Sequence, residues 1–507
     1  MKNSYVKPMR KIENDAWSRR RVLSTGAKTL SLLALPEFVV RKAWAQTATF
    51  DFYISPSGAD SNPGTLASPW AITSATRGSP NNSKMAGKRT GFMPGTYSVN
   101  TLPAPSAYED NILAIPHGSS SARTYWGTCD ANGSYSPRTA TLATNGSLSF
   151  AAGGIVGENT GGGSNAAGYW TLDGFIIDGG GMTSGGHFVQ AYGPGGIYSS
   201  SNPSACPGII VQNCEMRNML NGQSGNNDGF VFFEGTSGSI VQNCYFHDLQ
   251  KPNQPEPHMH CIEEYGCNGN QYLYNTFANI SNGATAVESK TGGAGTVVAY
   301  SYFYNVVPGS YGVIMGFDGS EGNPNSPATP YSVHHNVFDS CTRQIKSVDV
   351  GSTMTQGFNW YNNTVYNAAN SVFACSGPNA PLNHYNNIWA TSGSTTSLTF
   401  TTAGIAICDY NCYATASHSA TTGFDAHSIT SSPNFAGPIS AGSGPNQFKL
   451  ASGSPCLNAG RVGGAASGAT CNMGAWDGTV TQIGWNQGGS VSSTPPAVPD
   501  APVLTVS

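Results

Sequence analysis

The sequence has few charged residues, no C-x-x-C motif and no long apolar run. Only 10% of its 507 residues are charged, and the periodicity of amphipathic helices is rare. No C-x-x-C occurs, and no apolar stretch is long enough to stay in a bilayer as a helix. These absences argue against a helical bundle, a membrane span in the mature chain, and a zinc or haem site. No nucleotide site is expected either.

Turn-forming and β-forming residues are abundant instead. The chain contains 63 Gly and 31 Pro, together with many Asn, Ser, Thr and aromatic residues, which favours strands joined by turn-rich corners. A chain of 507 residues is long for one globular core. It suits a solenoid, in which each coil contacts only its neighbours.

Residues 1–46 are typical of a twin-arginine signal peptide. Arg19, Arg20 and Arg21 precede an apolar run over residues 27–40, and Ala43-Trp44-Ala45 offers a small-x-small cleavage site. We therefore expect export by the twin-arginine route to the periplasm or the extracellular space.

Removal of residues 1–46 would leave an acidic protein. The segment holds ten Lys/Arg and three acids, so its loss changes the formal net charge from −4 to −11. Such a surface repels a nucleic-acid backbone, which excludes nucleic acid as a partner. We expect a monomer.

All twelve cysteines follow the signal segment, as expected for an oxidising compartment. Their spacing allows disulfides but does not fix which cysteines pair. Three pairs are close in sequence: Cys261/Cys267, Cys408/Cys412 and Cys456/Cys471.

A short pattern recurs eight times between residues 211 and 415. The segments are VQNCEMRN, VQNCYFHD, YLYNTFAN, AYSYFYN, VHHNVFDS, WYNNTVYN, HYNNIWAT and CDYNCYAT. Their spacings of 30, 31, 26, 35, 27, 24 and 24 residues match one coil of a three-strand helix with loops of varying length.

The repeat aligns two columns of residues. A small polar column holds Cys214, Cys244, Asn275, Ser301, Asn336, Asn363, Asn387 and Asn411. A large column two positions later holds Met216, Phe246, Phe277, Phe303, Phe338, Val365, Trp389 and Tyr413. At the strand spacing of about 4.8 Å, the first column predicts an inward hydrogen-bonded ladder and the second a stack in the core.

These columns resemble those of the pectin-lyase-like right-handed parallel β-helix superfamily. The opening FYISPSGADSNPGTLASPWAI and the closing SPCLNAG and NMGAWDG are similar to the ends of secreted β-helix proteins. The resemblance implies an all-β solenoid of about ten or more three-strand coils over residues 47–480. Residues 481–507 form a Pro/Ser-rich tail that we expect to be disordered.

The strand after each ladder position indicates which side chains share an outer face. The alignment uses VFFEGT (231–236), CIEEYG (261–266), AVESKT (286–291), GVIMGF (312–317) and RQIKSV (343–348). If Phe233, Ile262, Val287, Val313 and Ile345 point inward, then Glu234, Glu263, Glu288, Ile314 and Lys346 form one outward column, with Lys290 on the same face as Glu288.

Stacked carboxylates repel one another unless a cation intervenes, and Ca²⁺ prefers oxygen ligands of this kind. The set resembles the calcium-dependent β-helix lyases, in which Glu residues hold Ca²⁺, a Lys is the base and an Arg is the acid. The resemblance implies Glu263, Glu288 and Glu234 as metal ligands, Lys290 as base and Arg343 as acid. In those lyases the Glu–Lys spacing is wider and the Arg comes one coil earlier.

A hydrolase is the alternative enzyme. The motifs around Asp228 and Arg343 faintly resemble those of β-helix polygalacturonases, but the expected aspartate pair is replaced by Met259-His260. Asp228, Glu263 and Glu264 would form a different carboxylate set.

The resulting hypothesis is an exported enzyme, most consistent with a lyase that cleaves a uronate-containing, acidic polysaccharide by β-elimination. Its catalytic residues would be Lys290, Arg343, Glu288 and His260, and its substrate-binding residues Lys346, Glu264 and Asp228. The alternatives are a β-helix glycoside hydrolase and a non-catalytic glycan-binding or surface protein.

Overall fold

The computed structural model describes most of the chain beyond residue 48. The described residues are 49–103, 110–144, 154–158, 168–182, 186–192, 206–220, 228–250, 259–290, 295–308, 313–318, 331–342, 345–347, 358–367, 372–375, 382–390, 397–400, 405–414 and 425–486. They all belong to one compact unit. The predicted signal segment, 1–46, lies outside them.

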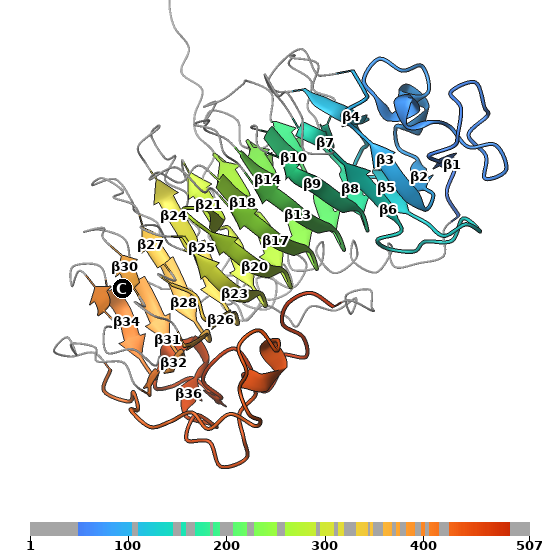
Figure 1. Ribbon diagram of the computed structural model, residues 1–507. Coiled ribbons are helices and arrows are strands. Elements are labelled where there is room, and N and C mark those ends of the chain that lie inside the picture. Colours follow the sequence, from blue (N-terminus) through green and yellow to red (C-terminus); the bar gives the residue numbers. More distant parts are fainter. Residues whose placement is uncertain are drawn as a thin grey trace, which may run out of the picture. The chain divides into compact units, whose positions relative to one another are not determined.

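The chain folds into three long parallel sheets, and each coil adds one strand to sheet 1, then sheet 2, then sheet 3 (Figure 1). Sheet 1 comprises β1 (Phe52–Ile54), β2 (Arg89–Phe92), β5 (Thr124–Thr128), β8 (Trp170–Asp173), β12 (Ile210–Gln212), β16 (Ile240–Gln242), β19 (Gln271–Leu273), β22 (Val297–Ala299), β25 (Tyr331–His334), β28 (Phe358–Tyr361), β31 (Leu382–Tyr385) and β34 (Ile405–Asp409).

Sheet 2 comprises β3 (Gly95–Ser98), β6 (Ala140–Ala143), β9 (Ile176–Met182), β13 (Glu215–Leu220), β17 (Tyr245–Gln250), β20 (Thr276–Ser281), β23 (Tyr302–Val307), β26 (Val337–Asp339), β29 (Thr364–Tyr366), β32 (Ile388–Ala390) and β35 (Cys412–Tyr413). Sheet 3 comprises β4 (Asn111–Ile115), β7 (Gly154–Glu158), β10 (Gly186–Tyr192), β14 (Asp228–Glu234), β18 (Met259–Tyr265), β21 (Thr285–Lys290), β24 (Ile314–Asp318), β27 (Ile345–Ser347), β30 (Val372–Cys375) and β33 (Ser397–Phe400).

The remaining described elements are short. They are the two-stranded pairs β11 (Cys206–Pro207) with β15 (Thr236–Ser237) and β36 (Gly460–Arg461) with β37 (Thr470–Cys471), and the 3₁₀ turns η1 (Ile72–Ala75), η2 (Asn82–Met85), η4 (Pro445–Phe448) and η5 (Val462–Gly464). The predicted parallel β-helix is thus confirmed. A right-handed sense is the one that parallel crossovers adopt almost without exception.

The polar column forms the expected ladder at the corner between sheets 1 and 2. The side-chain Oδ1 of Asn363 accepts a hydrogen bond from the backbone N–H of Asn336 at 3.1 Å, and Asn387 does the same for Asn363 at 3.0 Å. The Nδ2 of Asn363 donates to the carbonyl of Val333 one coil back. Each ladder amide therefore satisfies backbone groups that the corner would otherwise leave buried and unpaired.

The residue before each ladder position has a left-handed backbone, which turns the chain sharply. Four of these residues are asparagines with φ between 51° and 56°: Asn213, Asn243, Asn362 and Asn386. Asparagine tolerates this conformation because its short side chain bonds locally. Tyr274 and Tyr300 occupy the same position with φ of 57° and 55°, and their rings stack 5.0 Å apart.

The large column stacks in the core as predicted. The ring centroids of Phe246 and Phe277 lie 5.1 Å apart, those of Phe277 and Phe303 4.8 Å, and those of Phe303 and Phe338 4.6 Å. These side chains are fully buried, so each coil covers the apolar ring of the next.

Residues 425–486 close the last coil and return along the outside of sheet 2. Ile429 pairs with Cys412 at the open edge of β35, and Phe448 and Trp476 pack against Tyr302. The chain continues in contact through residue 486, within the predicted tail, where Trp485 stacks on Tyr245 at 4.8 Å.

The described cysteines have free thiols: Cys129, Cys206, Cys214, Cys244, Cys261, Cys267, Cys341, Cys408, Cys412, Cys456 and Cys471. None of the three disulfides that the spacing allowed is formed between these residues. Two of them, Cys214 and Cys244, occupy the ladder column as small core residues.

In the described part of the chain, no helix has the length and apolar character needed to cross a membrane.

Candidate functional site: a His/Glu/Glu cluster on sheet 3

The candidate site lies on β18 and β21, two neighbouring strands of sheet 3. Ile262 is opposite Val287, and Glu263 is opposite Glu288, as the alignment predicted. The alignment of β14 was wrong by two residues, because Val231 rather than Phe233 is opposite Ile262. Glu234 is therefore opposite Tyr265, and Phe232 occupies the row of Glu263.

A bend in the middle of these strands explains the misalignment. Cys261 and Ile262 are consecutive in the sequence, yet both are buried in the hydrophobic core, and so are Ala286 and Val287. Strict alternation is broken at that point. The residues on either side of the pair, His260 and Glu263 on β18, consequently lie on the same outer face.

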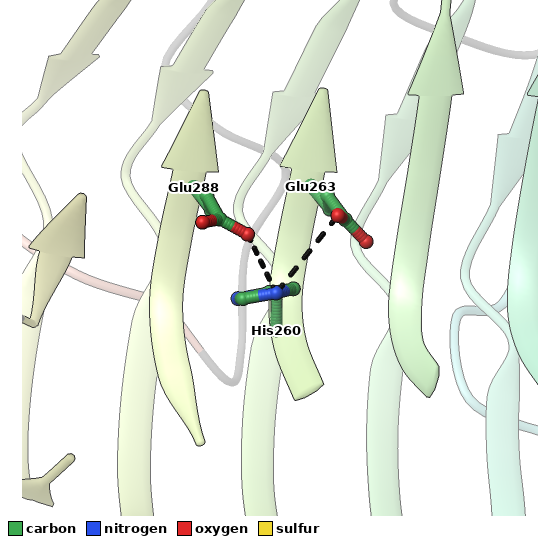
Figure 2. Close-up of side chains that lie close together, drawn as sticks. All are labelled: His260, Glu263 and Glu288. Carbon is green, nitrogen blue, oxygen red and sulfur yellow. Dashed lines mark ion pairs between the residues drawn. The ribbon is translucent and has the colours of Figure 1, made fainter. Parts of the chain in front are cut away.

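Three ionisable side chains meet on this face. The Nε2 of His260 lies 2.6 Å from a carboxylate oxygen of Glu288 and 3.9 Å from one of Glu263. Figure 2 shows the imidazole between the two carboxylates, with His260 and Glu263 on one strand and Glu288 on the next. All three are buried, with exposed fractions of 0% for His260 and 2% for each glutamate. One potential ligand atom from each residue lies within 4.8 Å of the other two.

A row of residues beside the cluster holds His260 in place. His260 is opposite Thr285 on β21, and its Nδ1 lies 2.6 Å from Thr285 Oγ1. This contact leaves Nε2 as the nitrogen that faces the carboxylates. On the other side, Gly229 lies between His260 and His187 in the row and contributes no side chain.

His187 is a second buried imidazole on this face, and the sequence pattern did not point to it. Burial, and then the charge of His260, lower the pKa of His187 to about 3, so its ring is neutral. The ring stacks on Phe232 at 4.6 Å. Only the alignment of β10 with β18 across Gly229 could have revealed it.

An aromatic strip adjoins the cluster. Phe232 lies 5.2 Å from Tyr192 and 5.6 Å from Tyr265, measured between ring centroids. Glu234 is in the row between Tyr192 and Tyr265 and is buried. Glu234 is thus two positions away from the row of Glu263 and outside the three-residue cluster, which corrects its predicted place in the metal-binding column.

Glu264 points to the interior, which corrects its predicted role in substrate binding. Its carboxyl accepts hydrogen bonds from Tyr272, Asn270, Ser289 and Thr296 at 2.5, 3.0, 2.8 and 2.7 Å. The side chain is fully buried. The hydrolase set of Asp228, Glu263 and Glu264 is also broken, because Glu263 and Glu264 lie on opposite faces of β18.

The next coil is displaced by one residue relative to the alignment. Ile314, predicted to point outward, is opposite Val287 and buried in the core, and Met315 is opposite Glu288. Lys346 is opposite Met315 and so belongs to the row of Glu288 by its backbone position.

The remaining predicted residues are placed by backbone position alone or not at all. Lys290 is opposite Tyr265, two residues along the strand from Glu288. Asp228 is opposite Gly186 and Met259. The side chains of Lys290, Lys346 and Asp228, and the whole of Arg343, lie outside the described residues.

The donors of the cluster fit Ca²⁺ only in part. Glu263 and Glu288 offer carboxylate oxygens, which Ca²⁺ prefers. His260 offers an imidazole nitrogen at the centre of the cluster, and this ligand suits transition metals instead.

Comparison with solved structures finds polysaccharide lyases among the similar chains. Pectate lyase Pel9A is 15% identical with a TM-score of 0.41, and the match covers 84% of this chain and 96% of that one. A rhamnogalacturonan lyase is 13% identical with a TM-score of 0.41, covering 68% and 83% of the two chains. A mannuronic acid specific family 6 polysaccharide lyase from human gut microbiota is 12% identical with a TM-score of 0.35, covering 67% and 72%.

No protein-family model matches the chain. No curated protein matches it either. Likenesses of this size leave the activity to be argued from the residues themselves.

Proposed function

We propose that the protein is an exported enzyme that acts on an acidic polysaccharide, as a lyase that cleaves a uronate-containing chain by β-elimination. The observation that carries the proposal is the meeting of His260, Glu263 and Glu288 on the outer face of sheet 3. Burying an imidazole beside two carboxylates costs free energy, because ionisable groups lose their hydration. Clusters of buried ionisable groups are found where catalysis or ligand binding requires them.

β-Elimination requires a base that removes the proton at C5 of the uronate and an acid that protonates the departing oxygen. Lys290 is the proposed base, because its backbone lies on the same strand as Glu288, two residues further. Arg343 is the proposed acid. His260 is a second candidate for proton transfer, because an imidazole next to a carboxylate can both accept and donate a proton.

The neighbouring aromatic strip, formed by Tyr192, Phe232 and Tyr265, lies on the same face of sheet 3 as the cluster. The three rings are at most 7% exposed, so they pack against one another beside the cluster and do not by themselves indicate a sugar substrate.

The test is to incubate the mature chain with alginate, pectate and glycosaminoglycans, with and without added divalent cations. A lyase produces an unsaturated sugar, which is followed by its ultraviolet absorbance. Lys290→Ala should abolish this signal. Lys449→Ala is the control and should not change it, because Lys449 lies over Trp476 in the C-terminal segment. New reducing ends without the absorbance would replace the lyase with a hydrolase.

A non-catalytic glycan-binding protein is the second candidate, and the burial of the cluster favours it. His260, Glu263 and Glu288 are at most 2% exposed, so their charges could serve the packing of the sheet instead of a reaction. In that case the protein would bind a glycan without cleaving it, and Lys290→Ala would leave the binding unchanged.

A further inference from the structure

We propose that His260, Glu263 and Glu288 form a binding site for a divalent transition-metal ion, such as Zn²⁺ or Mn²⁺, and not a site for Ca²⁺. The site uses one imidazole nitrogen and two carboxylate oxygens from two successive coils (Figure 2). The inference rests on the proposed function only in that both concern the same cluster.

The distances suit one shared ion. Donor atoms bound to a single tetrahedral ion, with bonds of about 2.1 Å, lie roughly 3.4 Å apart. Here the Nε2 of His260 lies 2.6 Å from Glu288 and 3.9 Å from Glu263. Small side-chain rotations would bring all three donors to the separation that an ion requires, without any movement of β18 or β21.

The donor types select the class of metal. Ca²⁺ takes oxygen ligands, six to eight of them, whereas imidazole is a common ligand of zinc and of other first-row transition metals. The nitrogen of His260 is the donor nearest to both carboxylates. Two carboxylates with a neutral imidazole carry a charge that a single dication would balance.

Thr285 has the role of an orienting residue behind the ligand. Its Oγ1 lies 2.6 Å from the Nδ1 of His260, and Thr285 is fully buried. Metal-binding histidines usually hold their second ring nitrogen through such a contact, which fixes the tautomer and the direction of the ring. In the metal-binding tautomer, Nδ1–H donates to Thr285 and the lone pair of Nε2 faces the ion.

Three protein donors leave a coordination position for water or for an oxygen of the substrate. Catalytic zinc sites have this composition, whereas structural zinc sites are closed by four protein ligands. The site would therefore be suited to bind a sugar carboxylate, which deepens the proposed function.

The experiment uses the full-length mature protein after treatment with a chelator. Co²⁺ is titrated as a spectroscopic probe, and the binding of Zn²⁺, Mn²⁺ and Ca²⁺ is measured by competition and calorimetry. We expect one Co²⁺ per chain, displaced by Zn²⁺ but not by equimolar Ca²⁺. His260→Gln should change the visible spectrum of the cobalt protein and weaken binding at least tenfold, and Thr285→Val should weaken it about tenfold to a hundredfold.

His427→Ala is the matched control, because His427 is an exposed histidine that pairs with Asp409 away from sheet 3. It should leave Co²⁺ binding unchanged. Circular dichroism checks that each variant is folded, and Glu263→Gln, close in shape to the native residue, provides a second test should His260→Gln fail to fold.

Two results would overturn the inference. One is stoichiometric Ca²⁺ binding that excludes Co²⁺ and is unaffected by His260→Gln; the other is the lack of any stoichiometric ion. The readout needs no substrate, so the two proposals fail separately. Metal binding without cleavage of any polysaccharide would contradict only the lyase, and cleavage without transition-metal binding would contradict only the metal site.

Discussion

Glu263 and Glu264 are adjacent in the sequence and lie in opposite surroundings. Glu264 points inward and receives hydrogen bonds from four side chains. Glu263 points outward, where its neighbours in the cluster are an imidazole and a second carboxylate. Both are almost completely buried.

The two sites differ in the interactions that would be lost if the carboxyl group were removed. The donors around Glu264 complete a closed set of hydrogen bonds within the fold, which is how buried polar groups stabilise a native structure. Around Glu263 the carboxylates approach each other, which costs stability unless a ligand offsets the repulsion. We interpret the inner site as structural and the outer site as functional.

The largest expected effect is that of Glu264→Ala. The substitution would leave four buried donors without their acceptor, and we expect a loss of about 4 kcal/mol or more in the free energy of unfolding. Urea unfolding measures it. Glu264→Gln keeps one acceptor oxygen and should lose less. A loss below about 1 kcal/mol for Glu264→Ala would remove the structural interpretation.

Glu158, another buried carboxyl of sheet 3, extends the comparison to pH. Burial raises the pKa of Glu158 from 4.5 to about 8, against hydrogen bonds from Cys206 and the Tyr192 amide that lower it. An acid whose pKa is raised by folding binds its proton more tightly in the native state. Its contribution to stability is therefore complete below pH 4.5 and declines as the pH rises toward 8.

Glu158→Gln should abolish this decline. Between these two pH values, the free energy of unfolding of the unsubstituted protein should fall by up to about 1.4 kcal/mol per pH unit relative to that of the variant. Unfolding measured at several pH values between 4.5 and 8 checks the difference. Parallel profiles for the two proteins would show that Glu158 ionises freely in the fold.

Asn363→Ala tests a neutral interior group, with an intermediate effect. The amide accepts from the Asn336 backbone at 3.1 Å and donates to the Val333 carbonyl at 3.0 Å, so its removal should cost about 2 kcal/mol. Asn363→Ser should cost less, because a hydroxyl can also accept from the ladder backbone, as Ser301 does from Asn275 in the same column. Equal losses by chemical denaturation would mean that packing, and not the ladder, accounts for the effect.

The smallest effect on stability is expected for Glu263→Gln. Removing one of two neighbouring negative charges should change the free energy of unfolding of the chelator-treated protein by less than about 1 kcal/mol. Metal binding should nevertheless be lost. A large destabilisation without added metal would make Glu263 a structural residue like Glu264, and the contrast between the two sites would disappear.

The repeat in the sequence was sufficient to predict the coils and the ladder. Asn275, Asn336 and Asn363 occupy the predicted inward corner, because one small polar residue per coil meets a requirement that every coil shares. The pairing of Glu263 with Glu288 was also predicted, because the alignment of CIEEYG with AVESKT has the register that β18 and β21 adopt.

The register of the sheet 3 strands, which lie further from the ladder corner, was not predictable in the same way. The alignment assumed strict alternation, but Cys261 and Ile262 both enter the core, and apolar residues at both positions give no sign of the bend. The same ambiguity between Val313 and Ile314 displaced the next coil. Such a shift of one or two residues is enough to move Glu234 out of the row of Glu263 and to conceal Glu264 as an interior residue.

The proposed metal site shows a further limit. No zinc site was expected, because the sequence contains no C-x-x-C motif. A ligand set that takes two residues from one strand and one from the next leaves no compact motif in the sequence. Only the register between β18 and β21 brings His260 within 2.6 Å of Glu288.

The closure of the last coil by residues 425–486 has a consequence for assembly. Ile429 donates its backbone N–H to the carbonyl of Asn411 and accepts from Tyr413, so it occupies the place of a strand in an additional coil. An uncovered parallel edge can pair with another chain end to end, and stacked coils could then extend into fibres. The segment thus also acts as a terminator, which keeps a structure that could grow without limit at the length of one molecule.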